Sequence, residues 1–166
     1  MKTDSIHQMT TRNNVTRLLE ARKIPFAAFE LASDEKTNAV DTALQLGVPP
    51  EMVFKTIVVT RSGKGKPILA LVPAPAEVDL KLVASAVNEK KVALPTQKEA
   101  EQLTGLQTGG ISPLALLNKG FQVLVDASAK NFSDIHVSGG QRGLNIRLPV
   151  QALIQLTNAK LIPIRR

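Results

Sequence analysis

The sequence contains no cysteine, no tryptophan and no tyrosine, and these absences narrow the chemistry open to it. Without cysteine there is no disulfide, no thiolate metal site and no cysteine nucleophile. Aromatic residues make up only 3% of the chain, so Val, Ile, Leu and Ala have to fill the interior. The absence of Tyr and Trp also removes side chains that often stack on nucleic-acid bases.

Familiar catalytic groups are scarce as well. The only histidines are His7, near the N-terminus, and His136, in a segment expected to be a strand. Neither has a second metal ligand close in the sequence, so we interpret His136 as structural and predict no metal or cofactor. No serine lies in a nucleophile elbow, and no H-E-x-x-H motif occurs. An enzyme built from this chain would therefore take its nucleophile from the substrate or from water.

Long hydrophobic runs are also missing. The longest, residues 68–76, contains two prolines and is far too short to cross a bilayer. Residues 1–5 lack the apolar segment of a secretory signal. With 166 residues, the chain is expected to form one domain over residues 1–166, located in the cytoplasm and without a membrane partner.

The charge is strongly basic. A net charge of +7 and a pI near 9.9 favour polyanionic partners, nucleic acid first. The lysines and arginines are spread along the chain and form no long basic run. The charge therefore indicates what the protein attracts but not what it does to it.

Apolar periodicity and capping residues predict a mixture of helices and strands. Because they do not follow strict βαβ alternation, the expected fold class is α+β, with a mixed β-sheet and helices packed around it. Helices are expected near residues 13–23, 38–46, 80–88, 97–104 and 149–157. Strands are expected near residues 26–31, 53–59, 68–72, 92–94, 121–126, 135–137, 144–148 and 161–164.

Local signals add detail to these elements. We expect Thr37 to cap the second helix, with Val40, Ala43 and Leu44 facing inward, and Asp79 to cap the third. Residues 96–99 match a capping box for the fourth. The glycines and lysines of residues 63–66 lack the spacing of a phosphate-binding loop and are expected to form the turn of a β-hairpin.

One lysine interrupts the most strand-like stretch. Residues 53–59 are β-branched or aromatic at every position except Lys55. An ammonium group is expensive to bury without a partner. Lys55 therefore either extends its charged end into solvent or lines a cleft that holds a polar or anionic ligand.

Two glycine-bearing stretches favour the cleft. They are residues 109–113, Gly-Gly-Ile-Ser-Pro, and residues 137–143, Val-Ser-Gly-Gly-Gln-Arg-Gly. Paired glycines let backbone N–H groups approach a ligand closely and converge on an oxyanion. A lysine, hydroxyl groups and backbone donors can position a substrate and stabilise developing negative charge.

These three stretches, in this order, resemble the YbaK family of aminoacyl-tRNA deacylases, which is related to the editing domain inserted in bacterial prolyl-tRNA synthetases. Weaker similarity extends over nearly the whole chain. The matching residues are Val53-Phe54-Lys55-Thr56, Thr104-Gly105 with Gly109-Gly110-Ile111-Ser112-Pro113, and Val137-Ser138-Gly139-Gly140 with Arg142-Gly143-Leu144.

The resemblance implies an open, barrel-like core and release of a wrong amino acid from the 3′ end of a charged tRNA, with cysteine on tRNA(Pro) as the expected substrate. The cysteine thiol would attack its own ester; in alanine-specific relatives water would. It also implies aminoacyl-tRNA as partner, with a prolyl-tRNA synthetase complex as a further one. The implied catalytic residues are Lys55, Gly109 and Ser138, and the implied substrate-binding residues are Thr56, Gly110, Ile111, Ser112, Gly139 and Gly140.

Other functions remain open at this point. A protein of the same fold could bind tRNA or an aminoacyl-nucleotide without turnover, or it could remove alanine or serine. A protein-interaction module is a third alternative, which the basic charge disfavours.

Overall fold

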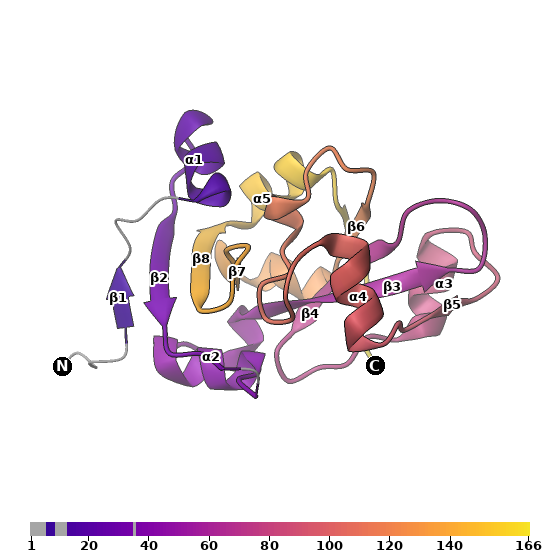
Figure 1. Cartoon of the computed structure of the whole chain (residues 1–166), viewed down its shortest axis with the longest axis horizontal. Coiled ribbons are helices and arrows are strands. Elements are labelled where there is room, and N and C mark those ends of the chain that lie inside the picture. The colour runs from indigo at the N-terminus through magenta and orange to yellow at the C-terminus, as the bar shows by residue number, and fades with distance from the viewer. Residues whose placement is uncertain (1–5, 9–12, 35) are drawn as a thin grey trace.

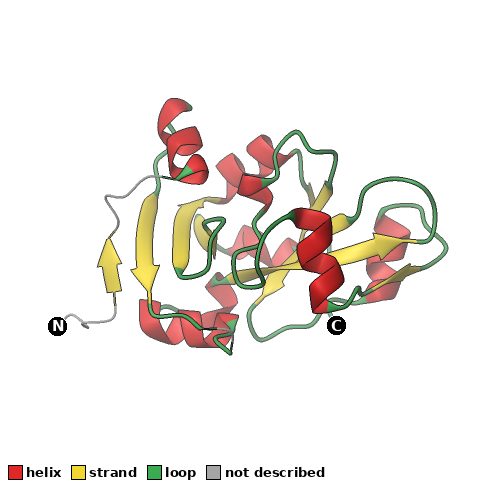
Figure 2. Ribbon diagram, viewed as in Figure 1, coloured by secondary structure: helices red, strands yellow, loops and turns green. Residues whose placement is uncertain are grey.

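The computed structural model describes residues 6–8, 13–34 and 36–166, which form two β-sheets with helices around them (Figures 1 and 2). The first sheet is antiparallel, in the order β1-β2-β8-β7. The second has the order β5-β3-β4-β6-β9 and is mixed, because β4, β6 and β9 run parallel. The strands are β1 (Ile6–Gln8), β2 (Ala27–Leu31), β3 (Phe54–Arg61), β4 (Ile68–Pro73), β5 (Val92–Ala93), β6 (Gln122–Val125), β7 (Asp134–Ser138), β8 (Leu144–Pro149) and β9 (Lys160–Leu161).

The helices lie close to their predicted positions, and the first four begin at side-chain capping residues. Asp79 caps the third, and a capping box of Thr96 and Glu99 opens the fourth, as predicted; Asn13 caps the first. The described α-helices are α1 (Asn14–Ala21), α2 (Ala39–Leu46), α3 (Leu80–Ala86), α4 (Gln97–Thr104) and α5 (Val150–Thr157). None in the described part of the chain has the length and apolarity that crossing a membrane requires.

Helix α2 corrects two predictions. Its cap is Asn38, whose side chain accepts a hydrogen bond from the N–H of Asp41, and not Thr37. Ala43 is buried as expected, but Val40 is 38% and Leu44 is 75% exposed. The buried face follows residues 39, 43 and 46, which pack on a small cluster with Val53. The apolar stripe of Val40 and Leu44 is rotated away from that cluster.

The predicted strands are also present, with shifted ends. β3 and β4 form the expected antiparallel hairpin. The terminal strand is shorter than predicted, since β9 ends at Leu161, and β1 was not predicted at all. Within the described residues, an isolated parallel bridge between Val53 and His136 links the two sheets. The α+β prediction with a mixed sheet is confirmed, and within the described residues the sheets do not close into a barrel.

Strand β3 separates two packed regions. Every residue of its neighbour β4 is buried, which makes this hairpin the centre of the molecule. From β3, Phe54 and Val58 pack in the cluster between the two sheets, whereas Ile57 and Val59 pack in a second cluster with α3. Because side chains alternate along a strand, Lys55 belongs to the face of Ile57, and Thr56 to that of Phe54.

Candidate active site

A pocket of about 300 Å³ lies at the start of β3, where the two sheets meet. Its walls come from the end of β2, the start of α2, the loop after α4, and the facing ends of β7 and β8. The pocket is therefore assembled from segments far apart in the sequence. Five of the nine sequence-predicted site residues line it: Lys55, Thr56, Gly109, Ile111 and Ser138.

Lys55 carries a partly buried positive charge beside this pocket. Its Nζ donates a hydrogen bond to the carbonyl oxygen of Ala74 at 3.0 Å. Burial lowers the pKa of the Lys55 ammonium, and the carboxylate of Glu77 partly opposes that shift. Since its bonded partner is a neutral carbonyl, the ammonium keeps N–H groups available for an anionic or ester oxygen.

The loop after α4 is held from both sides. The N–H of Thr108 donates to Glu101 Oε2 at 2.8 Å, and this hydrogen bond lowers the pKa of Glu101. The carbonyl oxygen of Thr108 accepts from Nε and Nη2 of Arg142, at 3.2 and 3.1 Å. The loop thus presents Gly109, with a φ of +90°, at the pocket in a fixed conformation.

Ser138 connects that loop to the turn after β7. Its hydroxyl donates to the carbonyl oxygen of Gly109 at 3.4 Å and accepts from the N–H of Gly140 at 3.3 Å. The hydroxyl thereby positions both glycine-bearing loops. Within the described structure it has no basic partner that would make it a nucleophile.

The other four predicted residues lie outside the pocket, and their contacts give the reason. Ser112 is fully buried, and its hydroxyl accepts from the N–H of Leu114 at the start of a 3-10 helix. A Cβ on Gly110 would lie 2.9 Å from the backbone of residues 141 and 142. A Cβ on Gly139 would lie 2.6 Å from the Leu144 side chain, and Gly140 packs near Val15. These residues hold the loops together.

Asn145 is a pocket residue that the sequence did not reveal. It is 5% exposed, and its Oδ1 lies 2.7 Å from Nδ1 of the buried His136. Because the amide oxygen only accepts, Nδ1 must carry the proton. Burial lowers the pKa of His136, against the effect of the Asn145 hydrogen bond, so the ring is neutral at pH 7. His136 is thus structural, as interpreted from the sequence.

Two polar groups that line the pocket, on Asn145 and Thr56, are available to a ligand, whereas Nε2 of His136, which has no partner among the described residues, is buried. The amide nitrogen of Asn145 has no acceptor within the described structure, and the residue lines the pocket. The hydroxyl of Thr56 is likewise buried without a hydrogen-bond partner there. Buried polar groups are normally paired, so the Thr56 hydroxyl indicates a missing polar ligand, and the Asn145 amide is a further donor available to it. The sequence signal that could have suggested a pocket role for Asn145 was the presence of an asparagine between Leu144 and Ile146 in a predicted strand.

The site is suited to binding and polarising an ester more than to supplying a nucleophile. It offers an ammonium group, an amide donor, hydroxyls and a glycine backbone. Among the described residues, no group of three His, Asp or Glu side chains is placed to hold a metal ion. Such donors stabilise negative charge that develops on an ester oxygen.

The sequence matches a known family over most of its length. A family model described as an aminoacyl-tRNA editing domain matches residues 33–156. A protein of Enterococcus faecalis, provisionally named Cys-tRNA(Pro)/Cys-tRNA(Cys) deacylase EbsC, is 36% identical over 150 residues, which are 90% of each chain.

Solved structures share the fold. The crystal structure of the hypothetical protein APE2540 superposes with a TM-score of 0.83 at 20% identity, over 93% of this chain and 100% of that one. A protein provisionally described as a trans-editing enzyme for prolyl-tRNA synthetase superposes with a TM-score of 0.77 at 21% identity, over 95% and 99%. At these identities the likeness establishes the fold alone.

Proposed function

Because the chain belongs to the family of aminoacyl-tRNA editing domains, we propose that it is a trans-acting aminoacyl-tRNA deacylase whose main substrate is cysteine esterified to tRNA(Pro). The observation that carries this proposal is a set of side-chain donors around one pocket: Lys55, whose ammonium uses one N–H on the Ala74 carbonyl, and the free groups of Thr56 and Asn145. They match an ester and a ribose, and they include no activated nucleophile. The substrate assignment is supported by the name of the relative that is 36% identical.

In the proposed reaction the substrate provides its own nucleophile. The cysteine sulfur attacks the ester carbonyl carbon, a C–S bond forms, and the C–O bond to the ribose breaks. The thiol proton ends on the ribose oxygen, so the products are a cyclic thioester and free tRNA. Lys55, the Asn145 amide and the Gly109 backbone hold the ester while negative charge develops on its oxygen.

Release of amino acids from charged tRNA(Pro) tests the proposal. The purified protein is incubated with tRNA(Pro) carrying cysteine, alanine or serine, and we expect cysteine to be released fastest. S-methylcysteine on the same tRNA is the matched control, because blocking the sulfur stops cyclisation but leaves hydrolysis by water open. Release of S-methylcysteine at the rate of cysteine would contradict the thiol mechanism. Release of none of the amino acids would contradict the deacylase proposal.

We also propose that the protein works in the cytoplasm on tRNA held largely through its phosphates, beside a prolyl-tRNA synthetase. The net charge of +7 supports the tRNA contact. Affinity for tRNA should then fall steeply as salt rises, because phosphate contacts release counterions. Co-elution with prolyl-tRNA synthetase in the presence of tRNA(Pro) tests the association, and separate elution at every salt concentration would contradict it.

A further inference from the structure

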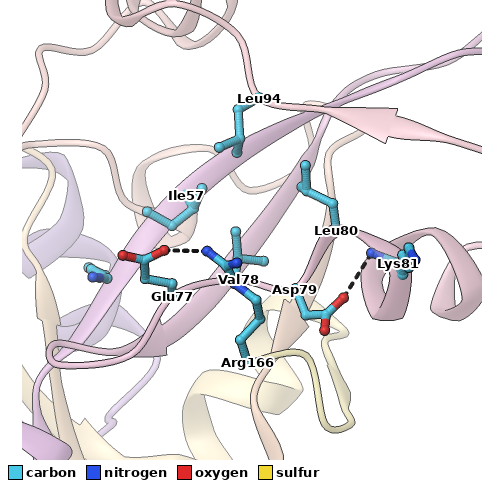
Figure 3. A pocket seen from close by; sticks show the side chains of 9 residues that line it. Ile57, Glu77, Val78, Asp79, Leu80, Lys81, Leu94 and Arg166 are labelled. Atoms are coloured by element: carbon cyan, nitrogen blue, oxygen red, sulfur yellow. Dashed lines mark hydrogen bonds and ion pairs between the residues drawn. The ribbon is translucent and has the colours of Figure 1, made fainter.

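A second pocket, of about 620 Å³, adjoins the candidate active site and shares Lys55 and Ile57 of β3 with it. Its other walls come from the segment between β4 and α3, from Leu94 just after β5, and from Arg166 (Figure 3). A ligand that leaves the active site past Lys55 would therefore enter this second pocket. Its volume lies within the range of roughly 300–1,000 Å³ typical of ligand sites.

Four aliphatic and five charged side chains line the second pocket. Ile57, Val78, Leu80 and Leu94 line the hollow (Figure 3). Leu94 is 54% exposed, so its side chain is accessible to a ligand in this pocket. These side chains offer flat apolar contact to a planar group such as a nucleobase.

The acidic side chains of the second pocket have hydrogen-bond or ion-pair partners, whereas two of its lysines have no ion pair with a described carboxylate. Asp79 caps α3 by accepting from two backbone N–H groups, and Glu77 forms an ion pair with Arg166 (Figure 3). In contrast, Lys81 has no ion pair with any described carboxylate, and Lys55 bonds only to the Ala74 carbonyl. The available charge is therefore positive, and it suits a phosphate.

We propose that this second pocket binds the nucleotide that precedes the terminal adenosine of the tRNA, with its base against Leu80 and Leu94 and a phosphate beside Lys81. The inference rests on the proposed function, which places the ester and its ribose in the first pocket. The single-stranded end must continue from there. The residues that line the second pocket include no aromatic side chain, so its aliphatic side chains would contact the base of that nucleotide.

Substrates of increasing length test the inference by activity. The aminoacyl esters of adenosine, of the trinucleotide CCA and of whole tRNA(Pro) are compared for wild type, Lys81→Ala and Leu94→Ala. Loss of the phosphate contact in Lys81→Ala should lower kcat/KM about tenfold for the CCA and tRNA esters and leave the adenosine ester within twofold. Loss of the base contact in Leu94→Ala should lower kcat/KM for the same two esters and spare the adenosine ester. Lys64→Ala, at the opposite end of β3 in the hairpin turn, is the matched control and should change none of them.

Equal losses on all three esters would overturn the inference, because the second pocket would then belong to the ester site. Unchanged rates on all three would overturn it as well.

Binding of unacylated RNA separates this inference from the proposed function. Wild type should bind the CCA trinucleotide more tightly than adenosine monophosphate, and Lys81→Ala should lose most of that difference. The slope of log affinity against log salt should also fall by about 0.7 in this variant. Trinucleotide binding without deacylation would refute the proposed reaction but support the second pocket. Deacylation together with equal affinity for the trinucleotide and for adenosine monophosphate would support the proposed reaction but refute the role of the second pocket.

Discussion

The loop after α4 and the turn between β7 and β8 both contain paired glycines, but they place them differently. In the first, Gly109 faces the pocket, and the Cβ it lacks would meet only the Arg142 side chain, at 3.5 Å. In the second, Gly139 and Gly140 face inward, and their missing Cβ atoms would meet Leu144 at 2.6 Å and Val15 at 3.1 Å. Gly109 thus faces the ligand, whereas Gly139 and Gly140 belong to the packing that holds its loop in place.

This difference implies that pocket-facing and inward-facing residues can be separated by experiment. Substitutions at the pocket should reduce activity while the protein stays folded. Substitutions at inward-facing positions should reduce stability first, and activity only as a consequence. Gly110 belongs to the second kind although it follows Gly109, because its missing Cβ would meet the backbone of residues 141 and 142.

The largest effect is expected at Lys55, the charged residue on the pocket side. Lys55→Ala removes a charge-assisted hydrogen bond, worth roughly 1.5–3 kcal/mol, from a partly desolvated site. Deacylation should fall about ten- to a hundredfold, with thermal unfolding little changed. Lys64→Ala, at the exposed hairpin turn, is the control and should keep full activity. A folded Lys55→Ala protein with wild-type rates would refute the site assignment.

A pair of glycine variants tests the comparison directly. Gly139→Ala forces a methyl group against the buried Leu144 and Ile146 side chains, and overpacking of this kind costs about 1–3 kcal/mol of stability. Gly109→Ala meets no such crowding but must adopt a φ of +90°, which costs about 1 kcal/mol or somewhat more. Urea unfolding should therefore show the larger loss for Gly139→Ala.

Activity should show the opposite order. Gly109→Ala places a methyl group at the pocket, where the substrate has to approach the backbone. Deacylation by the folded fraction should fall about tenfold in Gly109→Ala and by much less in Gly139→Ala. The same order of the two variants in both measurements would remove the distinction between the loops.

The local features of the fold and of the site could be predicted from the sequence. The capping residues, the hairpin and the strand with Lys55 could be predicted because each depends on a few neighbouring residues. The sequence could not show that Gly109 lies in the pocket whereas Ser112 and Gly139 lie outside it. Their position inside or outside the pocket depends on how two distant loops pack against each other. The pocket role of Asn145 likewise depends on the register that pairs Asn145 with Ser138 across β7 and β8.

A smaller effect is expected for the donor that this register places in the pocket. Asn145→Asp keeps the oxygen that accepts from His136 but replaces the free amide N–H₂ with an acceptor. Loss of one hydrogen bond of about 0.5–1.5 kcal/mol should lower kcat/KM roughly two- to tenfold. Asn38→Asp is the control, because it also adds a negative charge at the pocket but keeps the cap of α2. An equal loss in both variants would indicate a general charge effect.

The smallest effect concerns His136, which acts behind Asn145 and not on the substrate. Burial lowers the pKa of His136 in the folded protein, whereas in the unfolded chain its pKa is about 6.5. Above that pH both states are neutral, and the full stability is present. As the pH falls below about 6.5, the unfolded chain binds a proton at His136 that the folded protein does not bind, so the free energy of unfolding decreases.

The variant His136→Asn tests this pH dependence, because it can place an amide N–H near the position of Nδ1 but does not titrate. The stability advantage of wild type over His136→Asn should therefore shrink between pH 7.5 and pH 5.5, measured by urea unfolding. An advantage that grows on acidification would mean that His136 is charged in the folded protein, and Asn145 would then be held by a cation.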